Sequence, residues 1–148
     1  MISLSDLRRF KAEARKFSCL TCYDASMAKA MEIAQIDSIL IGDSLGMSIQ
    51  GRDSTLPVTV EDMAYHTAAV RRGNSHAFIM TDLPFMSYAT LNDALQNSRT
   101  VMQAGAQMVK MEGGAWLAET VEVLTRNGIP VCVHLGLTPQ SVHVLGGY

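Results

Sequence analysis

The sequence predicts an α/β fold in which parallel strands alternate with helices along the chain. Short apolar runs recur at regular intervals, and helix-like segments separate them. Runs that are apolar on both faces are typical of parallel strands covered by helices. The expected strands lie near residues 17–23, 38–42, 77–82, 107–112 and 130–134.

Helices are expected between these strands because capping residues and stop signals bracket the gaps. The expected helices are 25–35 after Asp24, 60–72 between Thr59 and Gly73, 91–104 between Thr90 and Gly105, and 115–127 before Gly128. The N-terminal stretch MISLSDLRRFKAEARKF is expected to form a further, amphipathic helix.

Five strands with four intervening helices fit either a TIM barrel or a doubly wound sheet, and the pattern alone does not choose between them. No GxGxxG or GxxxxGK(S/T) motif opens a helix, which argues against a nucleotide-binding sheet. Polar residues at strand ends favour the barrel, because barrels build their active sites there. A complete barrel needs about 250 residues. We therefore predict a (β/α)8 barrel of which residues 1–148, a single domain, supply about the first five strands and stop at Tyr148 in the following loop.

Composition and charge exclude several classes of partner. The chain of 148 residues is 48% hydrophobic and 18% charged, with a net charge of −2. Thinly spread lysines and arginines offer no basic face to nucleic acid or to an anionic membrane, and no apolar segment approaches the roughly 18 residues that span a bilayer. Small molecules are the expected partners. The cytoplasm is the expected location, because the N-terminus lacks the apolar block of a signal peptide.

The CLTC motif does not indicate a redox or zinc site. In an extended strand, Cys19 and Cys22 would point to opposite faces, about 10 Å apart, which is too far for a disulfide. No second CxxC completes a zinc site. These two cysteines and Cys132 are therefore expected to be reduced.

Three carboxylates occur where apolar runs end. Asp43 follows the second expected strand, Asp82 ends the third and Glu112 ends the fourth. On neighbouring parallel strands they would converge on one rim of the sheet, where burial and mutual repulsion require a compensating cation. Oxygen ligands without cysteine or clustered histidine favour a hard divalent ion, above all Mg²⁺.

Lys110 stands two residues before Glu112 and therefore shares its face of the strand, with Met111 on the other face. A buried ammonium group needs an anionic partner, either a protein carboxylate or the acid group of a substrate. A metal and an ammonium group at one rim form a receptor for a small 2-oxo acid, because the metal chelates its keto and carboxylate oxygens and acidifies the neighbouring carbon.

Structural roles for the same residues stay open at this point. A single aspartate after a strand is often a helix cap or part of a turn, and Ser44 has the same capping alternative. His134, at the end of the fifth expected strand, fits either a hydrogen-bonded core histidine or a residue just behind the site.

Several long motifs occur in order along almost the whole chain. They are IGDSLGM, GRDSTLPVTVEDMAYHTAAVRRG, DLPFMSYAT, AGAQMVKMEGG and HLGLTPQSVHVLGGY. By these motifs the sequence resembles the ketopantoate hydroxymethyltransferase (3-methyl-2-oxobutanoate hydroxymethyltransferase) family. The resemblance implies a (β/α)8 barrel of the phosphoenolpyruvate/pyruvate type, a homo-oligomer, and the first committed step of pantothenate and coenzyme A biosynthesis.

The resemblance also assigns residues to ligands. It places Asp43, Asp82 and Glu112 around Mg²⁺. The residues that it assigns to the substrate 3-methyl-2-oxobutanoate are Asp43, Ser44, Asp82 and Lys110.

The implied reaction removes the C3 proton of the oxo acid to give an enolate stabilised by Mg²⁺. The enolate then attacks the methylene carbon of the co-substrate 5,10-methylenetetrahydrofolate, water supplies the hydroxyl oxygen, and ketopantoate and tetrahydrofolate leave. The general base of the family is a glutamate from a later strand, beyond Tyr148. Because a positioned base contributes a factor of about 10² to 10⁴ in rate, residues 1–148 alone are expected to have little or no activity.

Two other hypotheses remain. A Mg²⁺-dependent lyase or mutase of the isocitrate lyase and phosphoenolpyruvate mutase type uses a similar acidic rim to stabilise enolates. The third hypothesis is a non-catalytic half barrel, which folds by pairing its exposed edge with another chain. Folate-dependent formation of ketopantoate separates the first two, and size in solution bears on the third.

Overall fold

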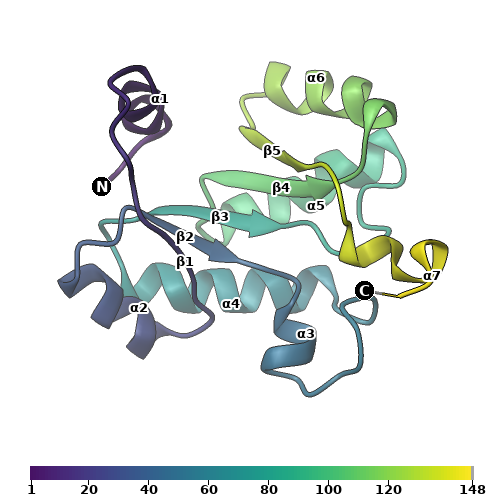
Figure 1. Cartoon of the computed structure of the whole chain (residues 1–148), viewed down its shortest axis with the longest axis horizontal. Helices are drawn as coiled ribbons and strands as arrows, with labels where there is room; N and C mark the ends of the chain where they lie inside the picture. The colour runs from purple at the N-terminus through teal and green to yellow at the C-terminus, as the bar shows by residue number, and fades with distance from the viewer. Residues whose placement is uncertain (148) are drawn as a thin grey trace.

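A parallel sheet of five strands forms the centre of the computed structural model, which describes residues 1–147 (Figure 1). The strands are β1 Cys19–Thr21, β2 Ser38–Ile41, β3 Phe78–Asp82, β4 Met108–Glu112 and β5 Val131–His134. They lie in the order β1-β2-β3-β4-β5. Doubly wound sheets reverse their strand order at a switch point, whereas a barrel keeps it sequential. The observed sequential order therefore supports the barrel and excludes the doubly wound sheet.

The main helices form where the capping residues predict them. Asp24, Thr59 and Thr90 each accept a hydrogen bond from a backbone N–H in the first turn of the helix that follows. The helices are α1 Leu4–Ala12, α2 Ala25–Ile33, α4 Val60–Gly73, α5 Leu91–Gln103 and α6 Ala118–Arg126. The 3₁₀ turn η1, Ala115–Leu117, precedes α6, so the expected helix over 115–127 is present in two parts.

Gly73 is the last residue of α4 and does not follow the helix as a stop. A Cβ atom at Gly73 would lie only 2.2 Å from the carbonyl oxygen of Ala25. Glycine is therefore required because the end of α4 packs directly against the start of α2. The helix ends at Asn74, whose backbone is extended.

Two segments that lie between the expected strands and helices, and for which the sequence predicts loops, contain short helices. Residues 43–58 include α3, Leu45–Ser48, and the segment after β5 forms the 3₁₀ turn η2, Pro139–Ser141, followed by α7, Val142–Leu145. Helices of one turn are too short to show a hydrophobic period, so the expectation of loops was wrong there. In Figure 1, α3 and α7 lie toward the carboxyl ends of the strands and α1 toward the amino ends.

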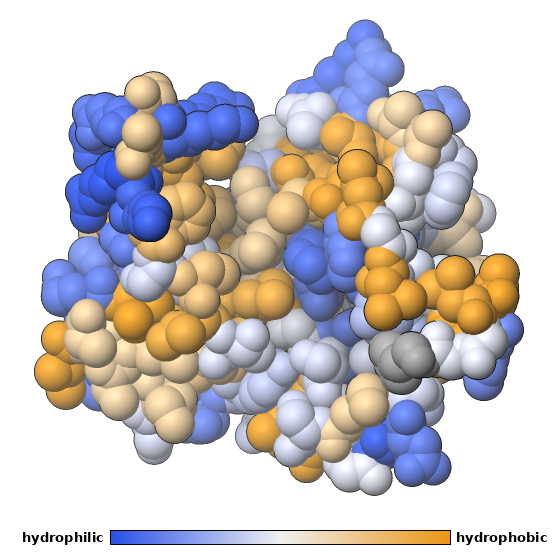
Figure 2. All heavy atoms as spheres, viewed as in Figure 1, coloured by the Kyte–Doolittle hydropathy of each residue, from blue (hydrophilic) through white to orange (hydrophobic). Residues whose placement is uncertain are grey.

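The core lies between the sheet and the helices. Ile39, Ile79, Val109 and Met111 alternate along the strands with less buried residues, and none of the four is exposed. The other face of the sheet is the one that Figure 1 views, since α4 and α5 lie behind the strands. In Figure 2, hydrophobic side chains surround a hydrophilic area near the middle of that face. The prediction that Met111 points away from Lys110 and Glu112 is confirmed.

Two predictions about chain chemistry also have outcomes in the structure. Cys19, Cys22 and Cys132 are free thiols, as predicted. Over residues 1–147, no helix combines the length and the apolar character that crossing a membrane requires.

Candidate active site

Strand register brings the predicted site residues together at one rim of the sheet. Asp82, at the end of β3, is the register partner of Lys110 on β4, and Glu112 is the register partner of His134 on β5. Asp43, just after β2, donates its backbone N–H to Asp82 Oδ2 at 3.1 Å. Asp43, Asp82 and Glu112 are only 3%, 3% and 7% exposed. Three carboxylates from separate segments therefore lie buried on neighbouring strands.

Lys110 forms a buried ion pair with Asp82. Its Nζ donates to Asp82 Oδ1 at 2.7 Å, and the two side chains are 15% and 5% exposed. Burial lowers the pKa of Lys110, but the negative charge of Asp82 and its neighbours outweighs burial, so this pKa lies above its ordinary value. From the sequence, neighbouring Glu112 is expected to neutralise the ammonium group in part, and the structure shows that Asp82 is its direct partner.

Negative charge exceeds positive charge at this rim. Burial, followed by the negative charge of Asp82, raises the pKa of Asp43 to about 7. Burial also raises the pKa of Asp82, against the opposing effect of Lys110. Both shifts have the sign expected where three carboxylates face the ammonium group of Lys110. The rim is therefore suited to bind a cation.

Glu112 is held by groups from β5 and from the segment that follows it. Its Oε2 accepts the backbone N–H of Gln140 at 3.0 Å, and its Oε1 lies 3.4 Å from His134 Nδ1. His134 therefore lies next to the carboxylate of Glu112 and, at 35% side-chain exposure, is not a core histidine. A cavity of about 310 Å³, lined in part by Tyr88 and Trp116, adjoins Glu112. A small molecule in this cavity would contact Glu112, whereas Asp43, Asp82 and Lys110 do not line it.

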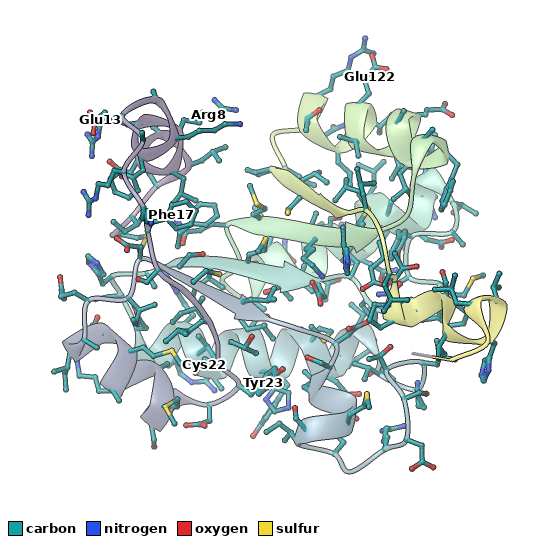
Figure 3. The ribbon with its side chains drawn as sticks, in the orientation of Figure 1. Arg8, Glu13, Phe17, Cys22, Tyr23 and Glu122 are labelled. Carbon is teal, nitrogen blue, oxygen red and sulfur yellow. The ribbon has the colours of Figure 1, made fainter. Side chains whose placement is uncertain are left out.

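Ser44 does not cap the helix that follows it. It precedes α3 without a side-chain capping hydrogen bond, so the capping alternative was wrong. Its Oγ lies 2.9 Å from the phenol oxygen of Tyr23, which follows β1 and is labelled in Figure 3. A Cβ atom at Gly42 would lie 3.0 Å from Ser44 Oγ and 3.5 Å from Asp82 Oδ2. Glycine at this position therefore keeps free the space between the serine and the carboxylate.

The model of the ketopantoate hydroxymethyltransferase family matches residues 1–148. The chain belongs to this family. Relatives named 3-methyl-2-oxobutanoate hydroxymethyltransferase are 89% identical in Acinetobacter baumannii (strain AYE), 84% in Acinetobacter baylyi and 68% in Psychrobacter sp. (strain PRwf-1). Each alignment covers all of this chain and 55% of the relative. The chain thus spans about half the length of the curated relatives that it matches.

Solved structures share the arrangement at low sequence identity. A 2,3-dimethylmalate lyase, a member of the PEP mutase/isocitrate lyase superfamily, superposes with a TM-score of 0.67 at 16% identity, over 90% of this chain and 52% of that one. Oxaloacetate acetylhydrolase gives a TM-score of 0.65 at 12% identity, over 88% and 52%. At such identities the likeness shows the fold alone. It confirms that this ketopantoate hydroxymethyltransferase family member is part of a TIM barrel.

The donor chemistry of this family member fits a hard divalent ion, because the rim offers carboxylate oxygens. In the conformation described, however, residues 1–147 contain no group of three or more His, Cys, Asp or Glu side chains placed to hold a metal ion. In this conformation Asp82 Oδ1 faces Lys110, and Asp43 Oδ2 accepts from Gln140 Nε2 at 2.8 Å. The residues are gathered, and a cation would bind the carboxylate oxygens that these donors do not occupy.

Sequence reasoning missed two residues that join the carboxylates. Gln140 donates to both Asp43 and Glu112, and Tyr88 accepts the backbone N–H of Glu112 and donates to Gln140. Neither residue is charged at neutral pH, and neither ends a strand, so a pattern of charged strand ends does not include them. Their one sequence signal is that each lies within a motif shared with the family, DLPFMSYAT or HLGLTPQSVHVLGGY.

Proposed function

We propose that the complete polypeptide in which residues 1–148 occur is a 3-methyl-2-oxobutanoate hydroxymethyltransferase. The reaction transfers a hydroxymethyl group, derived from the methylene of 5,10-methylenetetrahydrofolate and water, to 3-methyl-2-oxobutanoate and yields ketopantoate. One observation carries the proposal: the buried rim of Asp43, Asp82, Lys110 and Glu112 occurs in a chain 89% identical to a relative of that name.

Mg²⁺ is the ion that we assign to the rim. Asp43, Asp82 and Glu112 offer the oxygen ligands that this ion prefers. The excess negative charge there, expressed in the raised pKa of Asp43, is the physical basis for a cation. When bound, the ion supplies a Lewis acid that acidifies the carbon beside the keto group.

Lys110 and Ser44 are assigned to the oxo acid. The ammonium group of Lys110 offers positive charge to the substrate carboxylate while Asp82 keeps it protonated and in place. Ser44 offers its hydroxyl, whose direction is set by the phenol of Tyr23 at 2.9 Å. The resemblance to the family assigns the acceptor of the C3 proton to a glutamate from a later strand, outside residues 1–148.

The two competing hypotheses have weaker support. A lyase or mutase reaction is supported by the fold shared with 2,3-dimethylmalate lyase at 16% identity, and a shared fold does not determine the reaction. A non-catalytic half barrel is supported by the edge strands β1 and β5, each paired on one side within the described sheet. The identity to named hydroxymethyltransferases is far higher than either similarity.

The test is product formation by the complete polypeptide. Purified protein is incubated with 3-methyl-2-oxobutanoate and 5,10-methylenetetrahydrofolate, with Mg²⁺ or with EDTA, and ketopantoate is measured by mass spectrometry. Mg²⁺-dependent formation of ketopantoate is expected. Cleavage of 2,3-dimethylmalate without formation of ketopantoate would support the lyase hypothesis instead.

A matched pair of variants tests whether the activity depends on the rim residues. Asp43→Asn keeps the shape of a buried side chain but removes its charge, and we expect it to lower the rate by about 100-fold or more. Asp53→Asn is the control, because Asp53 is exposed in the segment that follows α3. Equal rates for the two variants would remove Asp43 from the site.

A further inference from the structure

Gln140 joins separate strand ends at the rim. It lies in η2 and is 7% exposed. Its side-chain Nε2 donates to Asp43 Oδ2 at 2.8 Å and to the carbonyl oxygen of Leu83 at 3.0 Å. Its backbone N–H donates to Glu112 Oε2 at 3.0 Å. One buried residue therefore contacts the segments that end β2, β3 and β4.

The orientation of the Gln140 amide is determined by its neighbours. Both amide hydrogens are donated to the acceptors of Asp43 and Leu83, and Oε1 accepts the phenol O–H of Tyr88. Tyr88 is in turn held by the backbone N–H of Glu112 at 3.2 Å. A flipped amide would face acceptors with its oxygen and a donor with its nitrogen. Rotation would thus break several buried hydrogen bonds at once.

The contacts of Gln140 occupy one oxygen on each of two carboxylates. Gln140 binds Asp43 Oδ2 and Glu112 Oε2, so that Asp43 Oδ1 and Glu112 Oε1 are the oxygens that a cation would bind. Glu112 Oε1 also lies 3.4 Å from His134 Nδ1. Without these donors, two buried carboxylates that repel each other would turn apart. Gln140 therefore opposes the rotation that repulsion favours.

Gln107 shows what a purely structural glutamine does in the same sheet. It precedes β4 at the opposite end from Glu112, accepts the backbone N–H of Ile79 and donates to the carbonyl oxygen of Ile2. Its amide contacts backbone groups, whereas Gln140 donates to two carboxylates. The comparison supplies a matched control.

We propose that Gln140 is a positioning residue that sets the carboxylates of Asp43 and Glu112 in a fixed relative orientation for cation binding. The inference rests on the proposed function, which places Mg²⁺ at this rim. When a group that hydrogen-bonds to a metal ligand is removed, the metal affinity typically falls by about 10- to 100-fold. Gln140 belongs to this class, although it carries no charge and comes from a segment beyond the fifth strand.

The experiment measures Mg²⁺ binding directly, with the ion alone as the probe. Gln140→Met keeps the side-chain volume but removes the side-chain donors to Asp43 and Leu83 and the acceptor for Tyr88, while the backbone N–H to Glu112 remains. Gln107→Met removes the side-chain donor and acceptor at the other end of the sheet. Isothermal titration of Mg²⁺ into the complete polypeptide gives the affinity, and thermal unfolding in EDTA gives the stability. Gln140→Met is expected to weaken Mg²⁺ binding at least 10-fold, while Gln107→Met binds Mg²⁺ as tightly as the unsubstituted protein.

Other outcomes would overturn the proposal. An unchanged Mg²⁺ affinity in folded Gln140→Met would show that the residue does not position the ligands, and so would an equal loss in both variants. If Gln140→Met does not fold, Gln140→Asn takes its place, since it keeps the amide on a side chain one methylene shorter. If neither variant folds, Gln140 is required for folding and the positioning role is refuted.

A crystal structure of Gln140→Met separates this inference from the proposed function. If the unsubstituted protein binds no Mg²⁺, the assignment of the ion fails. The carboxylates can still be compared without the ion. Rotation of the Asp43 carboxylate away from its present orientation supports positioning by the Gln140 side chain, and an unchanged Asp43 carboxylate contradicts it.

Discussion

The two ends of the parallel sheet use buried polar side chains in opposite ways. At the amino end, Asn74 accepts the backbone N–H groups of His76 and Ala77 at 2.9 and 2.8 Å and donates to the carbonyl oxygen of Ala28 at 3.0 Å. Gln107 makes the same kind of contact before β4. These neutral amides satisfy backbone groups that would otherwise be buried without partners.

At the carboxyl end, the buried side chains include four charged groups that lie near one another. Asp43, Asp82 and Glu112 face the ammonium group of Lys110, and burial with mutual repulsion raises the pKa of Asp43 to about 7. Such an arrangement costs stability unless a ligand completes it. The buried polar side chains at the amino end therefore stabilise the fold, whereas the charged side chains at the carboxyl end are available to bind a ligand.

The largest expected effect comes from breaking the ion pair at the carboxyl end. Lys110→Met leaves Asp82 buried without its cation, and we expect the free energy of unfolding to fall by about 4 kcal/mol. Urea unfolding in EDTA at pH 8 measures it. Adding Asp82→Asn to Lys110→Met should restore part of the loss, because the carboxylate that pairs directly with Lys110 is then absent. If Lys110→Met alone were as stable as the parent, Lys110 would not stabilise the buried carboxylates of the rim.

The next effect is a dependence of stability on pH that originates at Asp43. Its pKa is about 7 in the folded protein, against an ordinary value of 3.8. Between these values the folded state binds one more proton than the unfolded state, so stability falls as pH rises. Asp43 should contribute a loss of about 3 kcal/mol between pH 4 and pH 8 without divalent ions.

The control for this pH dependence is Asp43→Asn, which cannot titrate. Unfolding curves in EDTA should show a flatter pH profile for Asp43→Asn and a higher stability than the parent at pH 8. Identical profiles for the variant and the parent would assign the effect to other groups.

A smaller effect is expected at the amino end. Asn74→Ala removes a buried amide and leaves backbone groups without partners, at a cost of about 2 kcal/mol. Because these contacts lie at the opposite end of the sheet from the rim, Mg²⁺ affinity of the folded variant should not change. A loss of Mg²⁺ affinity as large as that of Gln140→Met would show that the two ends are not independent.

The smallest effect is expected at Tyr23. Tyr23→Phe removes the phenol that orients the hydroxyl of Ser44, and the loss of one hydrogen bond of about 1 kcal/mol corresponds to an increase of about fivefold in KM for 3-methyl-2-oxobutanoate. Steady-state kinetics on the complete polypeptide measure it, with kcat expected to change little. Tyr65→Phe is the control, since Tyr65 is 68% exposed on α4. An equal KM for both variants would remove Tyr23 from the proposed site.

Much of the fold follows from local patterns in the sequence. The caps at Asp24, Thr59 and Thr90 act within one turn of the helices that they begin, so adjacent residues are enough to predict them. Short apolar runs predict β2, β3 and β4, which contain buried residues. The runs of β1 and β5 also form strands, although the residues of β1 are exposed and those of β5 are only partly buried. The short helices α3 and α7 could not be predicted in this way, because a single turn has no period to detect.

The sequence by itself determined the alternation of strands and helices, the reduced cysteines and the carboxylates at the ends of strands. It also placed Lys110 and Glu112 on one face, since side chains alternate along a strand. The tertiary structure decided the sequential strand order, the pairing of Lys110 with Asp82 and the contact of Gln140 with Asp43 across 97 positions. These features depend on which distant segments meet, and that is set by packing of the whole sheet and not by any local pattern.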